Sequence, residues 1–131
     1  VYEPTSGDNG AGGKQEVLGI YYANSLDNKI TIGGNEYTVE LYVSDNGSLE
    51  ENAATAASKI VSENALVSLG SYGSGVSIAA ASTFESAGIP AIGISCTNAS
   101  VTEGHKFYFR TCFLDPFQGS VMADFALELI K

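Results

Sequence analysis

Short apolar runs alternate along the chain with segments whose apolar residues recur at helical spacing, and this alternation constrains the fold more than any other feature. The runs at residues 65–70 and 91–94 are short enough to be buried strands. Between them, apolar residues recur three and four positions apart from residue 76 to 87, which predicts a helix. Repeated strand, helix and strand in this order predict βαβ units with right-handed crossovers and a parallel sheet.

The first part of the chain is expected to contain a helix and a hairpin. Apolar residues at helical spacing predict a helix over residues 14–26, after a flexible glycine-rich loop at residues 7–13. The runs 29–32 and 36–44 are rich in Ile, Thr, Tyr and Val, and they flank the turn signal Gly33-Gly34-Asn35. They predict a hairpin whose second arm continues as a strand of the sheet.

Two further helices carry sequence signals for their ends. Ser48 with Glu51 three residues later has the spacing of a capping box. Ser74 is in place to cap the next helix, and Gly88 is the expected C-terminal cap of that helix. Behind Ser48, a stripe of mostly small residues predicts a helix that lies close on a sheet, namely Ala53, Ala56, Ala57, Ile60 and Val61.

The end of the chain is expected to form one more strand, over residues 107–112, and a last helix. Asp115 is the expected N-cap of that helix, with Pro116 in its first turn and Gln118 as the capping-box partner. Its apolar face is expected to consist of Val121, Met122, Phe125 and Leu129.

Together these elements predict an α/β fold with an open, doubly wound, mainly parallel five-stranded sheet and helices on both faces. Nothing marks a second domain, so one domain is expected over residues 1–131. In open parallel sheets, ligands bind beyond the carboxyl ends of the strands. A binding site is therefore sought in the loops that follow the predicted strands.

The segment Gly70-Ser71-Tyr72-Gly73-Ser74-Gly75 joins a predicted strand to a predicted helix. Amides at the start of that helix, with the Ser74 hydroxyl, can receive an anion such as a carboxylate or a phosphate. The dinucleotide fingerprint requires a third glycine where Ile78 stands, and no Lys completes a P-loop, so a nucleotide site is disfavoured. The alternative is that these glycines only form a tight turn.

The segment Ser95-Cys96-Thr97-Asn98 follows the predicted strand at residues 91–94 and should lie at the same edge of the sheet. Its hydroxyls and backbone carbonyls can hold an ammonium and a carboxylate together. The alternative is an ordinary polar loop with Asx and Ser/Thr turns. We expect Ser74, Ser95 and Thr97 to line one shallow depression.

Charge and composition exclude several classes of function. A formal net charge of -9 argues against nucleic acid and anionic membrane surfaces as partners. The single histidine, His105, lies in a polar run that indicates a surface turn, and no pattern brings it to a nucleophile. We therefore expect a binding protein and no enzyme, with no cofactor and no metal. Cys96 and Cys112 could form a disulfide or remain two buried thiols.

The segments, in their order and spacing, resemble the type I periplasmic binding proteins, and in particular the leucine/isoleucine/valine-binding family of ABC transporters. The segments that carry the resemblance are GSYGSG at 70–75, AGIP at 87–90, CTN at 96–98, FRTC at 109–112 and DPFQG at 115–119.

The resemblance implies that two α/β lobes close on an amino acid and that the first lobe grips its charged ends. The matching positions are Ser74, which would hold the α-carboxylate, and Thr97 with the backbone of Ser95, which would hold the α-ammonium. Cys96 and Tyr72 lie beside them in sequence and complete the candidate ligand-binding set. An aromatic residue that some members carry in the first loop is matched by Gly12, and the cysteine pair differs from the disulfide of some relatives.

Family members are much longer, so the resemblance also implies that this chain is the first part of lobe I with the second lobe absent. It implies a small-molecule ligand (an amino acid or amide), a membrane permease as partner of the full-length protein, and an extracytoplasmic location, in the periplasm or lipid-anchored at the outer cell surface. The fragment is expected to self-associate as a homodimer. The alternative function is the ligand-sensing module of a receptor or regulator with the same fold.

Overall fold

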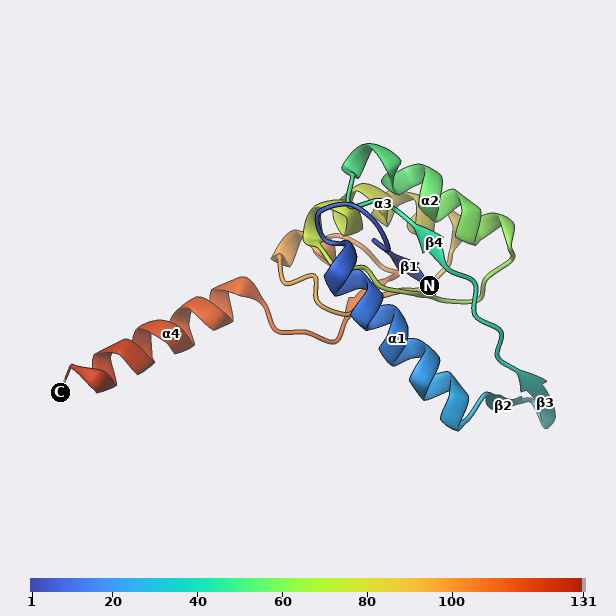
Figure 1. Cartoon of the computed structure of the whole chain (residues 1–131), viewed down its shortest axis with the longest axis horizontal. Coiled ribbons are helices and arrows are strands. Elements are labelled where there is room, and N and C mark those ends of the chain that lie inside the picture. The colour runs from blue at the N-terminus through green and yellow to red at the C-terminus, as the bar shows by residue number, and fades with distance from the viewer. Residues whose placement is uncertain (131) are drawn as a thin grey trace.

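The computed structural model describes residues 1–130, and Lys131 lies outside the described residues. The described part forms, in order, β1 (Tyr2–Glu3), α1 (Gly10–Leu26), β2 (Lys29–Ile32), β3 (Asn35–Thr38), β4 (Ser44–Asp45), α2 (Glu50–Ser62), β5 (Ser68–Leu69), α3 (Ser74–Ala87), β6 (Ala91–Gly93), the 3-10 helix η1 (Ala99–Val101), β7 (Tyr108–Arg110) and α4 (Asp115–Leu129) (Figure 1).

The strands confirm the α/β class, but the prediction of one five-stranded sheet is wrong. β1 and β4 form a parallel pair, β5, β6 and β7 form a parallel three-stranded sheet, and β2 and β3 form a separate antiparallel hairpin. β1 lies beside β5. Between them, the amide of Tyr72 donates to the side chain of Glu3, so a side-chain contact joins the two sheets at this point.

The core lies between the strands and the helices α2 and α3, which pack closely on each other (Figure 1). Four members of the predicted stripe of α2 are buried, namely Ala53, Ala56, Ala57 and Ile60, and the fifth, Val61, is partly buried against the same core. Tyr2 contacts Phe84 of α3 edge to face, with ring centroids 5.5 Å apart, and its hydroxyl donates to the carbonyl of Val76. The small residues allow the helix to approach the sheet, and the two aromatic rings fill the remaining space.

Residues 10–13 of the predicted glycine-rich loop (7–13) belong to the start of α1. Gly10 and Gly13 are buried, and a side chain at Gly13 would collide with the carbonyl of Pro4. The absence of side chains lets the first turns of α1 lie against the segment after β1. The hairpin turn is as predicted, but β3 ends at Thr38, and the chain rejoins a sheet only at β4.

Side-chain caps predicted from the sequence are absent at the three helix starts concerned. α2 begins after Leu49, and the Ser48 hydroxyl instead donates to the carbonyl of Ser6. α3 begins after Gly73, so Ser74 is the first helical residue, and α4 begins after Leu114 with Asp115 already helical. Long-range contacts outcompete local capping at Ser48. The C-terminal cap at Gly88 is confirmed, with a left-handed φ of 66°.

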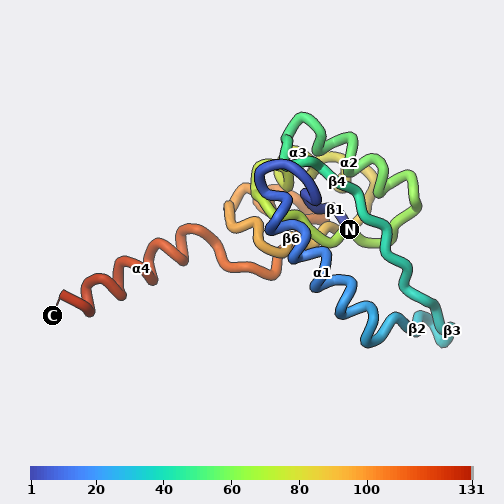
Figure 2. The backbone as a smooth tube through the Cα atoms, in the orientation of Figure 1, coloured from blue at the N-terminus to red at the C-terminus, as the bar shows by residue number. Residues whose placement is uncertain are grey.

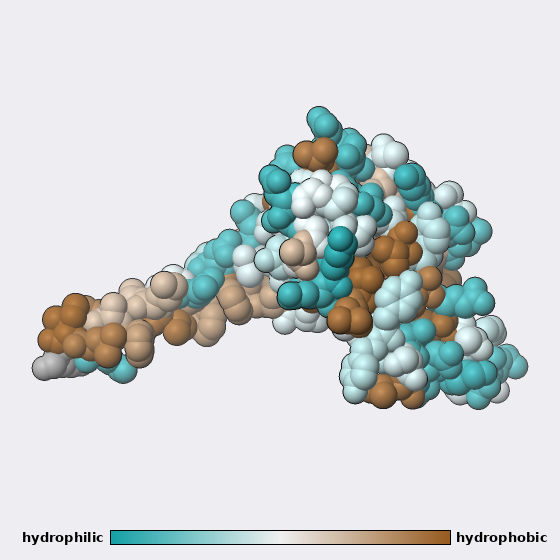
Figure 3. Space-filling model, in the orientation of Figure 1, coloured by the Kyte–Doolittle hydropathy of each residue, from teal (hydrophilic) through white to brown (hydrophobic). Residues whose placement is uncertain are grey.

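The helix α4 projects away from the rest of the chain, and none of its residues is buried (Figures 1 and 2). Its apolar residues form part of the hydrophobic surface in Figure 3, and Leu129 is 71% exposed. The predicted apolar face of this helix therefore exists but contacts no core here. None of the helices in residues 1–130 combines the length and apolar character needed to cross a membrane.

Candidate functional site

The loops after β5 and β6 meet where α3 begins. The Ser74 hydroxyl oxygen accepts a hydrogen bond from the amide of Asn98 at 3.2 Å. Ser74 is half-buried in the first turn of α3, where backbone amides have no partner within the helix. The structure thus brings the two predicted segments together, with the positive end of a helix dipole beside them.

Ser95 and Thr97 are both half-buried in the loop after β6. The Ser95 hydroxyl donates to Oε1 of Glu16 on α1. The carbonyl of Thr97 accepts from the amide of Asp115 at 3.1 Å, which fixes the point where α4 departs. Ser95 is therefore held by its side chain and Thr97 by its backbone, which leaves the Thr97 side chain as the better placed of the two to meet a ligand.

Tyr72 provides an aromatic ring at this edge of the structure. It is partly exposed, and a Cβ added at Gly12 would come within 2.6 Å of its ring. The ring therefore covers the first turn of α1 at Gly12, the position where some family members carry an aromatic residue of their own. The amide of Tyr72 donates to Oε2 of Glu3 at 2.7 Å, which fixes the backbone that carries the ring.

Cys96 is buried beneath the loop, and a side chain at Gly93 would collide with its sulfur. Burial raises the pKa of its thiol. Cys96 and the half-buried Cys112 are both free thiols in the structure. The side chain of Cys96 thus faces the interior, and only its backbone is placed to contribute to a site.

Arg110 holds the same loop from β7. Its guanidinium donates to the carbonyls of Cys96, Asn98 and Ala99 at 2.9, 2.8 and 3.0 Å, and to the Thr102 hydroxyl at 2.7 Å. Carbonyls that accept from a fixed cation cannot rotate freely. Arg110 therefore sets the backbone shape of the loop that carries Thr97.

Asp45, at the end of β4, organises the loop after β1. It accepts from the amide of Thr5 at 2.8 Å, from the hydroxyl of Ser6 at 2.6 Å and from the amide of Gly47 at 2.8 Å. Partial burial opposes ionisation, but these hydrogen bonds outweigh it and lower the pKa of Asp45 to about 2. The loop is thus ordered by a carboxylate that stays ionised at neutral pH.

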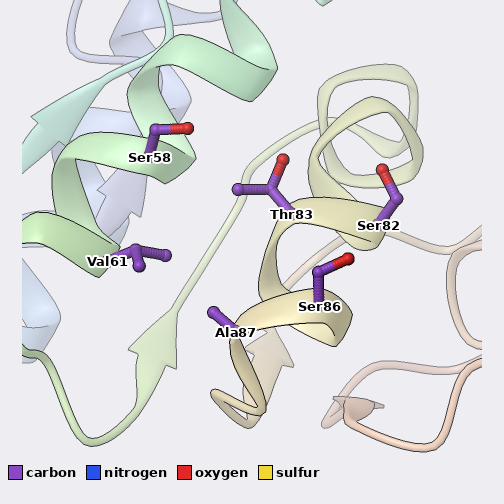
Figure 4. A pocket seen from close by; sticks show the side chains of 6 residues that line it. All are labelled: Ser58, Val61, Ser82, Thr83, Ser86 and Ala87. Carbon is purple, nitrogen blue, oxygen red and sulfur yellow. The ribbon is translucent and has the colours of Figure 1, made fainter.

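A hollow between α2 and α3 lies away from these residues. It has a volume of about 510 Å³, and Figure 4 shows α2 and α3 contributing its walls, which are Ser58, Val61, Ser82, Thr83, Ser86 and Ala87. A second hollow of about 290 Å³ lies beside Asp45. Neither of these two hollows is lined by Ser74, Ser95 or Thr97.

The sequence patterns did not identify Glu3, Glu16 and Arg110 as residues that hold the site. Glu3 and Arg110 are ionisable residues within short strands, and an ionisable residue in a strand is a signal that could have pointed to them. Glu16 lies on a helix face where a carboxylate is unremarkable from sequence alone. Among residues 1–130, no three His, Cys, Asp or Glu side chains gather closely enough to hold a metal.

Comparison with known proteins identifies the family to which the chain is similar. Residues 1–129 match a family described as periplasmic binding protein. An amino acid binding protein of Pseudomonas aeruginosa is 31% identical over all of this chain and 35% of its own length. The crystal structure of the leucine binding protein LivK of Thermotoga maritima is similar with a TM-score of 0.87 and 35% identity, over 98% of this chain and 36% of that one.

The branched-chain amino acid binding protein LivJ of Streptococcus pneumoniae, solved in complex with isoleucine, is similar with a TM-score of 0.77 and 27% identity. That similarity covers 87% of this chain and 33% of LivJ. The chain therefore spans about one third of the length of the relatives that it matches.

Proposed function

Because the chain belongs to the periplasmic binding protein family, we propose that it is the first part of lobe I of a two-lobed receptor that delivers an amino acid to the permease of an ABC transporter. The family is one of binding proteins, so the site is assigned no catalytic group. The proposed ligand is an amino acid of the branched-chain type or a related amide.

The observation that carries this proposal is the contact between Ser74 and Asn98 at the start of α3. It places a hydroxyl and the unpaired amides of a helix N-terminus beside the Thr97 loop. The amides and the Ser74 hydroxyl suit a carboxylate, and the Thr97 hydroxyl with nearby carbonyls suits an ammonium. An α-amino acid presents these two groups on one carbon, so one short surface can hold both.

The named relatives support the ligand class. The LivK protein is a leucine binding protein, and LivJ was solved with isoleucine. The side chain of the ligand would be selected partly by the second lobe, which this chain does not include, and partly by Tyr72. Family membership implies an extracytoplasmic location, and we propose the periplasm or a lipid anchor at the outer cell surface.

Substitution at the two proposed contacts tests this function in the complete two-lobed protein. We expect Ser74→Ala and Thr97→Val each to weaken amino-acid binding by about 1 to 3 kcal/mol, because each leaves a charged group of the ligand without a hydrogen bond. Stability should change little. Ser82→Ala, on the exposed side of α3, is the matched control and should bind as the wild type does. Wild-type affinity in both site variants would place the site elsewhere.

A further inference from the structure

Two carboxyl groups meet beneath the loops of the candidate site. Glu3, at the end of β1, is completely buried, and its Oε2 accepts from the amide of Tyr72. Glu16, on α1, accepts from the Ser95 hydroxyl through Oε1. The remaining oxygens, Glu3 Oε1 and Glu16 Oε2, are buried and have no donor among the residues that the structure describes.

These two oxygens can form a hydrogen bond with each other only if one of them carries a proton. Two ionised carboxylates in contact and out of water repel strongly, and a buried acceptor without a donor is costly. One proton removes both penalties, because the protonated carboxyl donates to the ionised one. The side chains of Glu3 and Glu16 are close enough for this hydrogen bond.

We propose that Glu3 and Glu16 share one proton and that this bond positions the two loops of the candidate site. Glu3 holds the loop after β5 through the Tyr72 amide, and Glu16 holds the loop after β6 through Ser95. The shared proton links these two contacts across β1 and α1. The two residues are positioning residues, since neither carboxyl is free to reach a ligand. The part of the proposal that concerns ligand binding rests on the proposed function.

The surroundings of the pair favour the proton. Burial, followed by the hydrogen bond to Glu16, raises the pKa of Glu3 to about 9, while the Tyr72 amide and the amino group of Val1 act in the opposite direction. The other ionisable groups beside Glu3 are the phenols of Tyr2 and Tyr108, whose pKa values are raised by burial, so they remain neutral. At neutral pH the pair therefore retains one proton.

Gly70 makes room for this arrangement. A side chain at Gly70 would collide with the carbonyl of Tyr2 and with the carboxyl of Glu3. The chain after β5 can therefore pass over Glu3 only because residue 70 has no side chain. The Tyr72 amide reaches Glu3 as a consequence.

The pair makes stability depend on pH in a defined direction. The folded chain holds the shared proton up to about pH 9, whereas an unfolded glutamate with a pKa of 4.5 has lost it. The stabilising contribution is complete below pH 4.5 and is lost as the pH rises toward 9, because the folded state must take up a proton that the unfolded state does not hold. Between these limits the unfolding equilibrium constant should rise about tenfold per pH unit relative to Glu3→Gln.

Carbon NMR of the 131-residue chain, with labelled glutamate, tests the proposal without any ligand. In the wild type, one carboxyl group of the pair should remain protonated at pH 7. The resonance of its carboxyl carbon should titrate with a midpoint near pH 9. The Cβ resonances of Tyr72 and Ser95 should move with the same midpoint. Glu3→Gln keeps a donor toward Glu16 and an acceptor for Tyr72, so it should retain the fold and abolish this titration in both loops.

Glu16→Gln should lower the midpoint of Glu3 by about two pH units or more, because the like charge is gone and the new amide donates to the carboxylate. Glu63→Gln, at an exposed position, is the control and should leave every midpoint unchanged. The proposal is overturned if both carboxyls of the wild type are ionised at pH 7, if Glu16→Gln leaves the Glu3 midpoint in place, or if Tyr72 and Ser95 do not follow it. Since no ligand is present, these results are independent of whether the amino-acid function is correct.

Discussion

Arg110 lies on β7, but its four hydrogen bonds all go to the segment between Cys96 and Thr102. A lysine could not form this set, since a single ammonium cannot spread donors over several carbonyls as a planar guanidinium does. At the scale of single residues, the candidate site thus depends on side chains that would never touch the ligand. Arg110 fixes the loop backbone, and Glu3 and Glu16 hold the loop edges.

Removal of the Arg110 donors should destabilise the chain and disorder the loop. We expect Arg110→Met, which keeps most of the side-chain length, to lower the free energy of unfolding by about 3 kcal/mol, because partly buried carbonyls lose a charged donor. Arg110→Lys should recover only part of this. Urea unfolding provides the measurement, with the exposed Lys106→Met as control. An Arg110→Met variant as stable as that control would show that the bonds contribute nothing.

At the scale of secondary structure elements, the sequence predicted the order and type of most helices and strands. The periodicity that predicted α2 and α3 reflects which residues face the core, and this is a local property of the pattern. The boundaries near α1 and β3 were wrong, because they depend on contacts distant in sequence. Residue 13 lies in α1 and has no room for a side chain against Pro4, and Ser48 caps no helix because it donates to Ser6.

The distinction between local patterns, which can be predicted, and contacts distant in sequence, which cannot, applies also to the site and to the sheet. The adjacency of Ser74 and the 95–98 loop could be anticipated, since both follow parallel strands that are neighbours. The contacts of Glu16 with Ser95 and of Tyr72 with Gly12 could not, because they join α1 to loops far away in sequence. The division of the strands into two parallel sheets and a separate hairpin also escaped the pattern, which gives strand propensity but not the partner of each strand.

The connection after β5 should be sensitive to any side chain at residue 70. Gly70 has a φ of 117° and lies against Tyr2 and Glu3, so Gly70→Ala is both strained and obstructed. We expect it to lower the free energy of unfolding by about 3 kcal/mol or more. Gly104→Ala is the matched control, since Gly104 also has a positive φ of 79° but open space around it. The control should cost about 1 kcal/mol, and equal losses in a thermal or urea unfolding experiment would contradict the contact argument.

At the scale of the whole molecule, α4 is the feature that a self-contained domain does not explain. Its residues Phe117, Val121, Phe125 and Leu129 are four positions apart and form one exposed apolar face. The chain spans about one third of the length of its relatives, and we propose that further chain covers this face in the complete protein. In the isolated chain the face is free to contact a second copy.

The isolated chain should therefore self-associate, with a dimer as the simplest product. Val121→Ser combined with Phe125→Ser should raise the dimer dissociation constant at least about tenfold, since two apolar side chains leave the contact. Leu66→Ser, which alters an 82% exposed residue away from α4, is the control. Light scattering coupled to size exclusion measures the association. A clean monomer at high concentration would contradict the account of α4.

The isolated chain should also bind amino acids weakly or not at all. Two-lobed receptors gain affinity when they close around the ligand and exclude water, and a single open lobe leaves the charged ends of the ligand half solvated. Micromolar amino-acid binding by the monomeric 131-residue chain would show instead that it is a complete binding module.

Calorimetry of the complete two-lobed protein against a panel of amino acids, amides and urea tests the central claim most directly. The account predicts saturable binding of a branched-chain amino acid or a related amide. For an amino-acid ligand, binding should be lost when the α-carboxylate or the α-ammonium is removed from it, because Ser74 and Thr97 are proposed to hold these groups. Absence of binding across the panel would contradict the account, as would amino-acid binding that does not depend on either charged group.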